Sequence, residues 1–389
     1  MSDLCQEFGI SREVGYKVWD RYQAMGVPGL DDQRHGPKRI PHRTSEAVKA
    51  LVIEVRKAHP TWGPKKLYAW LSKNHPGVTF PAPSTMGDQL AQAGLVEKRV
   101  RVRRASGWQG RSGLMKAGAP NDLWCIDFKG QFRLGNGTDC YPITITDQYS
   151  RYLLACEALD STEGKPVKAV MEGIFKKHGL PRRIRSDNGE PFASTGLFGL
   201  SQLSAWWIQL GVEVERIEPG HPEQNGAHER MHLTLKKETT RPAAENELKQ
   251  QERFDRFQKE FTEERPHEAL NQTTPAEHYR TSERAYPGSD PTLLYPLHDR
   301  ILQGNASGHL RLGGRGTSFY LSSSLSGQSV GLRELENQRW LVTFAHLDVG
   351  HDEEQTQQWI PLDGGGRKAK TIPPLYPPNG EKPAEVERA

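Results

Sequence analysis

Three acidic residues, Asp127, Asp187 and Glu229, lie in local contexts suited to binding a divalent metal at a phosphodiester bond. Asp127 lies within an apolar, strand-like run, and Asp187 ends a second such run and opens an Asp-Asn-Gly turn. Glu229 lies near the start of an expected helix that follows an Asn-Gly turn at 225–226. Magnesium prefers hard oxygen ligands and is usually held by a few carboxylates together with substrate phosphate oxygens. Two such ions roughly 4 Å apart can activate an attacking oxygen and stabilise the leaving one, so the pattern indicates nucleic-acid chemistry.

The size and composition of the chain restrict its class. A length of 389 residues predicts two to four domains, and 35% hydrophobic with 26% charged residues indicates a soluble globular protein. No segment has the apolar length of a membrane span, and the first residues lack the pattern of a secretory signal. The four cysteines form no close pair, which argues against a zinc knuckle or a disulfide framework and predicts a reduced, cytoplasmic setting.

Positive charge is concentrated near the N-terminus. Residues 1–111 carry 19 lysines and arginines against 10 acidic residues, a net charge of +9. Because the whole chain has a net charge of +4, the remainder carries −5. A basic first third predicts a nucleic-acid-binding region, although a well-solvated basic surface would look the same.

Residues 1–30 predict a helix-turn-helix unit that looks truncated at its start. Two short helices flank Gly9, and Ser11 is expected to cap the second. Three residues at four-residue spacing are expected to face a core: Val14, Val18 and Tyr22. The residues expected to enter a major groove are Arg12, Tyr16 and Lys17. An ordinary helical hairpin is the alternative.

A second helical unit is expected at 44–97, with a winged or tri-helical fold. Its third helix would read DNA from residue 84 onward, beginning with Ser84 and Thr85. A basic linker at 98–119 follows, and its charged start is expected to run along a phosphate backbone or to be a solvated linker. The candidate phosphate contacts there are Lys98, Arg99, Arg101, Arg103 and Arg104.

The pattern changes to an α/β region at 120–280. Strand-like runs at 123–133, 140–147 and 151–158 precede helices that alternate with short strands, which predicts a mixed sheet flanked by helices. Alternating runs at 290–360 predict a small all-β domain resembling a barrel. The tail at 364–389 has the composition of a disordered segment.

An ordered series of motifs resembles the insertion-sequence DDE transposases of the retroviral-integrase superfamily, which have a ribonuclease-H-like core. The series is WCIDFK at 124–129, DQYSRY at 147–152, SDNGEPF at 186–192, HPEQNGAHER at 221–230, TLKKE at 234–238, RPHEAL at 265–270 and TPAE at 274–277. FGIS at 8–11 is also similar to the first helix-turn-helix of a bacterial subgroup. The resemblance covers roughly residues 2–280.

The resemblance implies that Asp127, Asp187 and Glu229 are the catalytic carboxylates and the ligands of two Mg²⁺ ions, for which Mn²⁺ could substitute. The interval between Asp187 and Glu229 holds 41 residues, which is longer than usual in the family. An interval of the usual length would end at Glu223, which we reject because it precedes the Asn-Gly turn. We attribute the extra length to a surface insertion around 193–201.

The resemblance also implies a DNA transposase that binds terminal inverted repeats, cleaves 3′ ends and joins them to target DNA. Its partners would be double-stranded DNA and further copies of the chain, as a dimer or tetramer, with no membrane. It would act in the bacterial cytoplasm, associated with the nucleoid. Additional DNA contacts are expected on the helix of Glu229, at Arg230, Lys236 and Lys237.

Two other functions also fit parts of the sequence. The pattern HERMH at 228–232 also fits a zinc protease, but we expect His228 and His232 to face DNA or solvent. A non-catalytic DNA-binding regulator, or a decayed element product, is the second rival. Asp147 is expected to have a structural role in a turn, and Trp206 and Trp207 to pack in the core.

Overall fold

The computed structural model describes residues 1–31, 44–96, 114–218, 220–311, 318–336, 339–353 and 358–362. The chain forms two compact units, Met1–Lys49 and Ala50–Ala389. The basic residues expected at 98–104 and the expected disordered tail lie outside the described residues. Among the helices that are described, none is long and apolar enough to cross a membrane.

The first unit contains α1 (Ser2–Glu7), α2 (Arg12–Met25) and the short η1 (Val27–Leu30). Ser11 caps α2 as expected, since its hydroxyl accepts from the Val14 amide at 3.3 Å. The expected core face is wrong: Val14 and Tyr22 are exposed, and the residue that α2 buries is Gly15. The six-residue α1 is too short to cover that face, and it meets α2 where a Cβ on Gly15 would collide with the Cys5 sulfur.

The second helical region consists of α3 (Glu46–Ala58), α4 (Pro64–Asn74) and α5 (Pro83–Gln92). Each helix contributes an apolar stripe, and the side chains that are fully buried between them include Trp62, Leu67, Leu71, Met86 and Leu90. The described residues 44–96 contain no strand, so of the two expected folds this region has the tri-helical one.

The central sheet has the order β5-β4-β1-β6-β7. Its strands are β1 (Leu123–Phe128), β4 (Ile143–Asp147), β5 (Leu153–Glu157), β6 (Arg183–Ser186) and β7 (Glu213–Arg216). The pairs β1–β4 and β4–β5 are antiparallel, whereas β1–β6 and β6–β7 are parallel, so the expected mixed sheet is confirmed. The strand expected at 123–133 breaks at Gly130, where φ is +85°. Beyond it, β2 (Phe132–Arg133) and β3 (Asp139–Cys140) form a separate hairpin.

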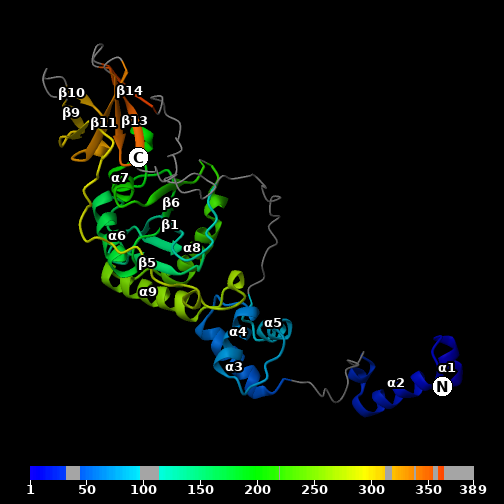
Figure 1. Ribbon diagram of the computed structural model, residues 1–389. Helices are drawn as coiled ribbons and strands as arrows, with labels where there is room; N and C mark the ends of the chain where they lie inside the picture. The colour runs from blue at the N-terminus through cyan, green and yellow to red at the C-terminus, as the bar shows by residue number, and fades with distance from the viewer. Residues whose placement is uncertain are drawn as a thin grey trace. The chain divides into compact units, whose positions relative to one another are not determined.

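Helices cover the sheet, as Figure 1 shows. Helices α6 (Gly164–His178) and α7 (Gln202–Gln209) pack in one apolar cluster with Trp124 and Ile126 of β1. Helices α8 (Gly226–Thr239) and α9 (Glu247–Lys259) pack in a second cluster with Leu153 and Cys156 of β5, and the π-helical turn η4 (Glu260–Glu264) continues α9. Because side chains alternate along a strand, Asp127 points to the opposite face from Ile126, which is the face of α8.

The C-terminal region is all-β, as expected. A five-stranded antiparallel sheet has the order β14-β13-β12-β11-β8, and β9 and β10 form a two-stranded sheet. The strands are β8 (Arg300–Gln303), β9 (His309–Arg311), β10 (Ser318–Tyr320), β11 (Ser329–Leu335), β12 (Arg339–Phe344), β13 (Leu347–Glu353) and β14 (Gln358–Pro361). Short helical turns complete the chain at η2 (Leu197–Gly199), η3 (Pro222–Asn225), η5 (Glu268–Leu270), η6 (Pro275–Glu277) and η7 (Ser323–Leu325).

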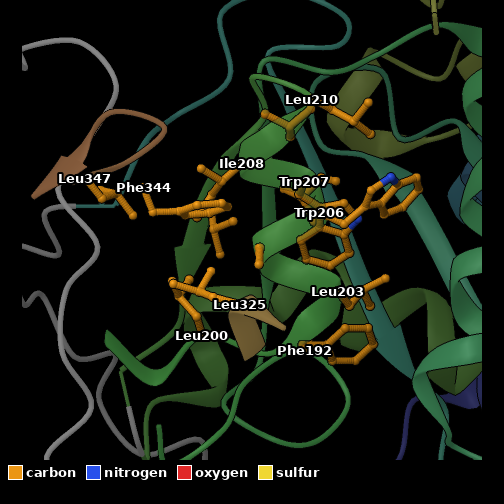
Figure 2. Close-up of a cluster of buried hydrophobic side chains, with 14 of the residues drawn as sticks. Phe192, Leu200, Leu203, Trp206, Trp207, Ile208, Leu210, Leu325, Phe344 and Leu347 are labelled. Atoms are coloured by element: carbon orange, nitrogen blue, oxygen red, sulfur yellow. The ribbon is translucent and has the colours of Figure 1, made fainter. Parts of the chain in front are cut away.

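Helix α7 joins the C-terminal sheet to the core. Figure 2 shows Ile208 next to Phe344 of β12, while Trp206 lies on the other side of the helix. Both Trp206 and Trp207 are buried, which confirms their expected core role. The insertion expected on the surface at 193–201 is instead part of this core, because Leu197, Phe198 and Leu200 are buried in the same cluster.

Candidate functional site

The first two candidate carboxylates lie at the ends of two neighbouring parallel strands, Asp127 within β1 and Asp187 directly after β6. Cys125 of β1 pairs with Arg185 of β6, and Asp127 and Asp187 each stand two residues beyond this pair. The two aspartates therefore reach the same edge of the sheet. The backbone amide of Gly189 donates to Asp187 Oδ1 at 3.1 Å, which fixes the turn after β6.

The third candidate, Glu229, lies in the first turn of α8 and is exposed. The charge of Glu229 contributes to the pKa of Asp127. Burial is the largest cause, and together with the charges of Asp187 and Glu229 it raises the pKa of Asp127 to about 7. The Phe128 amide and the Lys129 charge oppose this rise without cancelling it. Three carboxylates thus lie close enough to repel one another, and a divalent cation bound among their oxygens would relieve that repulsion.

The rejected alternative, Glu223, falls within the short turn η3 that precedes α8. Its side chain lies outside the described part of the structure, so the choice between Glu223 and Glu229 stays a prediction.

The expectation that His228 and His232 face DNA or solvent is wrong, because both are buried. His228 Nδ1 lies 2.8 Å from the hydroxyl of Thr146, and its Nε2 lies 2.8 Å from the hydroxyl of Thr144. His232 Nε2 lies 2.7 Å from the same Thr144 hydroxyl, and its Nδ1 is 3.8 Å from Asp127 Oδ2. Burial lowers the pKa of His228 to about 3 and that of His232 to about 2, so both imidazoles are neutral.

The histidine pair also forms a possible metal-binding group with Asp127. The candidate ligand atoms of these three residues lie within 4.8 Å of one another. However, both Nε2 atoms are directed at the Thr144 hydroxyl, which favours hydrogen bonding over the open site that a catalytic zinc requires.

Asp147 has the structural role that the sequence predicted. Its carboxylate is fully buried and accepts from the Asn121 amide at 2.7 Å, the Ser150 amide at 2.7 Å and the Ser150 hydroxyl at 2.6 Å. A carboxylate so occupied closes the turn after β4 and is not available to a metal.

Basic side chains border the carboxylates. Arg230, Lys236 and Lys237 are exposed on α8, as DNA contacts must be. Lys129 was not among the expected site residues, and its pKa is lowered by partial burial and then by the nearby charge of Lys236. Its position two residues after Asp127 was the available signal.

The candidate DNA contacts in the helical regions are also on the surface. Ser84 and Thr85 are exposed in the first turn of α5. On α2, the side chains of Arg12, Tyr16 and Lys17 are exposed, and Lys17 pairs with Glu13 at 2.6 Å.

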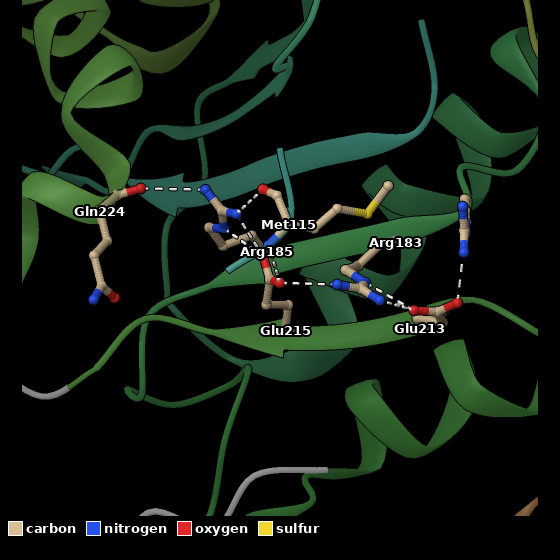
Figure 3. A network of polar contacts seen from close by, with 7 residues as sticks. Met115, Arg183, Arg185, Glu213, Glu215 and Gln224 are labelled. Atoms are coloured by element: carbon tan, nitrogen blue, oxygen red, sulfur yellow. Dashed lines mark hydrogen bonds and ion pairs between the residues drawn. The ribbon is translucent and has the colours of Figure 1, made fainter. Parts of the chain in front are cut away.

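Arg185 was also not among the expected site residues, and it lies at the centre of a polar network (Figure 3). Its guanidinium donates to Glu215 at 2.7 Å, to the carbonyl oxygen of Met115 at 2.7 Å and to that of Gln224 at 3.2 Å. Gln224 lies in η3, two residues before α8, so Arg185 ties the strand that precedes Asp187 to the start of the helix that carries Glu229. An arginine inside a buried strand, two residues before the aspartate, was the only sequence signal.

Comparison with known families places these residues in context. Residues 117–222 match a family model described as an integrase core domain, and residues 210–275 match a second integrase core domain model. Residues 14–90 match a homeodomain-like domain. All three candidate carboxylates therefore lie within the integrase core matches.

The chain is also similar to proteins of insertion elements. The chain is 26% identical over 280 residues to the insertion element IS476 uncharacterized 39.2 kDa protein of Xanthomonas euvesicatoria, covering 70% of this chain and 77% of that protein. It is 25% identical over 244 residues to the insertion element IS407 uncharacterized 31.7 kDa protein of Burkholderia multivorans, covering 61% and 82%. The catalytic core domain of the HTLV-2 integrase, solved in complex with magnesium, aligns at 12% identity and a TM-score of 0.34, over 42% of this chain and all of that chain.

The chain is therefore similar to a homeodomain-like domain over residues 14–90, to integrase core domains over residues 117–275 and to insertion-element proteins, which agrees with the expected resemblance to insertion-sequence DDE transposases of the retroviral-integrase superfamily.

Proposed function

We propose that this chain is a DNA transposase that binds the terminal inverted repeats of a mobile element, cleaves at the 3′ ends and joins them to target DNA. One observation carries the proposal most directly. Asp127 and Asp187 lie at the same edge of the sheet, and burial of Asp127, together with the charges of Asp187 and Glu229, raises the pKa of Asp127 to about 7. If these residues served stability alone, each carboxylate would be expected to pair with a positive charge or to lie apart from the other two.

Asp127, Asp187 and Glu229 would hold two Mg²⁺ ions, or Mn²⁺ in their place, since carboxylate oxygens are the ligands these hard cations prefer. When bound, the ions supply Lewis-acid stabilisation of the charge on the attacking and leaving oxygens. The residues of the chain then have to position DNA: Lys129 and Lys236 stand where a phosphate beside the carboxylates would meet positive charge.

The reaction needs two successive displacements at phosphorus. Water first attacks the phosphodiester at the end of the element, and the freed 3′-hydroxyl then attacks a phosphodiester of the target. No covalent enzyme intermediate is required, because positioning and charge stabilisation lower the barrier.

DNA recognition is assigned to the helical regions. The exposed N-terminal turn of α5, with Ser84 and Thr85, and the exposed face of α2, with Arg12 and Tyr16, would provide base and phosphate contacts. We propose that Lys98 and the arginines after it add phosphate contacts. Two element ends must be held together, so we propose a dimer or tetramer that acts on the nucleoid in the bacterial cytoplasm.

The test uses the full-length chain and duplex oligonucleotides that carry the DNA flanking its coding region. We expect 3′-end cleavage and strand transfer with Mg²⁺ or Mn²⁺, and neither reaction with Asp187→Asn. The matched control is Asp139→Asn, which removes an aspartate on the β2–β3 hairpin and should keep activity. DNA binding with no cleavage by the unaltered chain would instead identify a non-catalytic regulator.

A further inference from the structure

Helix α8 carries polar residues on two sides. Glu229 is exposed, whereas His228 and His232 are buried on the side that packs on the sheet, next to the apolar residues Met231 and Leu235. Apolar packing alone would fill these two positions with apolar side chains, since buried polar groups are costly unless each finds a partner. Apolar packing therefore does not explain why histidines occupy these two buried positions.

Their partners belong to the strand next to Asp127. Thr144 of β4 is paired in register with Asp127 of β1, and its hydroxyl donates to the Asp127 carbonyl oxygen at 3.2 Å. The same hydroxyl lies 2.8 Å from His228 Nε2 and 2.7 Å from His232 Nε2, and because it has a single proton, at least one of these ring nitrogens must donate to it. The hydroxyl of Thr146 completes the network at 2.8 Å from His228 Nδ1.

This network fixes position in a way that apolar contacts do not. Burial of apolar surface is non-directional, whereas hydrogen bonds weaken steeply when their distance or angle changes. A rotation of α8 by one residue, or a slide by a fraction of a turn, would break bonds to both threonines at once. Glu229 directly follows His228, so the same bonds set where its carboxylate stands.

We propose that His228, His232, Thr144 and Thr146 form a buried hydrogen-bonded seam that positions Glu229 relative to Asp127 for metal binding. The inference rests on the proposed function, because it assigns a purpose to the position of a metal ligand. The four residues act as positioning residues and do not touch the reacting groups.

The test compares Thr144→Val, which removes the hydroxyl at nearly constant volume, with Thr144→Ser, which keeps it. We expect Thr144→Val to weaken Mn²⁺ binding by about tenfold, and Thr144→Ser to stay within about threefold of the unaltered chain. Mn²⁺ binding is measured by electron paramagnetic resonance on the full chain without DNA, so the readout does not depend on activity. Thr262→Val is the matched control, since Thr262 is equally buried but donates to backbone carbonyls of α9.

A double-mutant cycle separates positioning from general damage. In a Glu229→Gln background, Thr144→Val should change Mn²⁺ affinity by less than about twofold, because the ligand that the seam positions is already gone. A tenfold loss that persists in that background, or a Thr144→Val chain that binds as tightly as the unaltered one, would overturn the seam. If Thr144→Val does not fold, His232→Leu against His232→Gln gives the same comparison.

Two further results are informative. Stoichiometric Zn²⁺ binding that both His232 variants abolish would make the pair metal ligands and would also overturn the seam. Failure of the proposed function is distinct: Mn²⁺ binding would then be indifferent to Asp187→Asn, and the unaltered chain would not transfer strands.

Discussion

Two clusters of charge share one face of the central sheet, and they are built in opposite ways. Two arginines of β6 face two glutamates of β7, and each of these buried charges has a partner of opposite sign. Arg183 bonds Glu213 and Glu215, and Arg185 bonds Glu215. At the edge beyond these strands, burial and then the charges of Asp187 and Glu229 raise the pKa of Asp127. The cluster of paired charges, called balanced, holds the strands and the start of α8 in place. The cluster of carboxylates, called unbalanced, has excess negative charge that a bound cation would neutralise.

The largest expected effect distinguishes the two candidates for the third carboxylate. Glu229→Gln should reduce strand transfer on the order of 10³-fold, because it removes a metal ligand while keeping the shape of the side chain. Glu223→Gln, the matched control, should keep activity within a few-fold of the unaltered chain. Single-turnover assays with Mn²⁺ measure both, and the opposite ranking would transfer the ligand role to Glu223.

The balanced cluster can be broken at its centre. Arg185→Met should lower the free energy of unfolding by about 3 kcal/mol, because it leaves Glu215 buried beside fewer positive charges. Arg133→Met removes an arginine that is 73% exposed and paired with Asp139 at 3.6 Å, so it should cost below about 1 kcal/mol. Denaturant titration measures both variants, and equal losses would contradict the contrast between buried and exposed pairs.

The unbalanced cluster predicts a gain of stability upon loss of function. An aspartate whose pKa is about 7 when folded and 3.8 when unfolded costs stability as pH rises between these values, since the folded form holds its proton more tightly. Asp127→Asn without metal should therefore stabilise the chain increasingly up to pH 7, by about 2 kcal/mol above it after allowance for partial exposure. Thermal unfolding in EDTA between pH 5 and 8 measures this, and a gain independent of pH would contradict it. Added Mg²⁺ should shrink the difference.

The smallest effect concerns DNA binding near the site. Lys236→Ala should weaken binding by about two- to fivefold at moderate salt and reduce the salt dependence of the affinity by about one counterion. Lys249→Ala on α9, where the lysine is paired with Glu245, should change neither quantity. Fluorescence anisotropy over a salt series makes the comparison. An unchanged slope for Lys236→Ala would remove this residue from the DNA path.

Much of the fold could be predicted because its signals are local. The strand-like runs that became β1, β4 and β6 are bounded by turn residues, and α6 and α8 begin at glycines and carry a helical apolar period. The predictions of burial were wrong where burial depended on contacts with residues distant in the sequence. Val14 and Tyr22 have the spacing of a core face, but among the described residues of their unit no element covers them, and both are exposed. Residues 193–201 have the pattern of a surface loop, yet Leu197, Phe198 and Leu200 are buried in one cluster with residues of α7 and of the C-terminal sheet.

The sequence by itself determined which residues could do the chemistry: three carboxylates in turn and helix-start contexts, with basic side chains after the third. It determined these because residue type and local context are written directly in the chain. Only the tertiary structure decided that His228 and His232 face Thr144 and not DNA, and that Arg185 ties β6 to α8. Those contacts join residues 39 to 88 positions apart. The packing of a helix on a sheet brings these residues together, and no local sequence pattern encodes that packing.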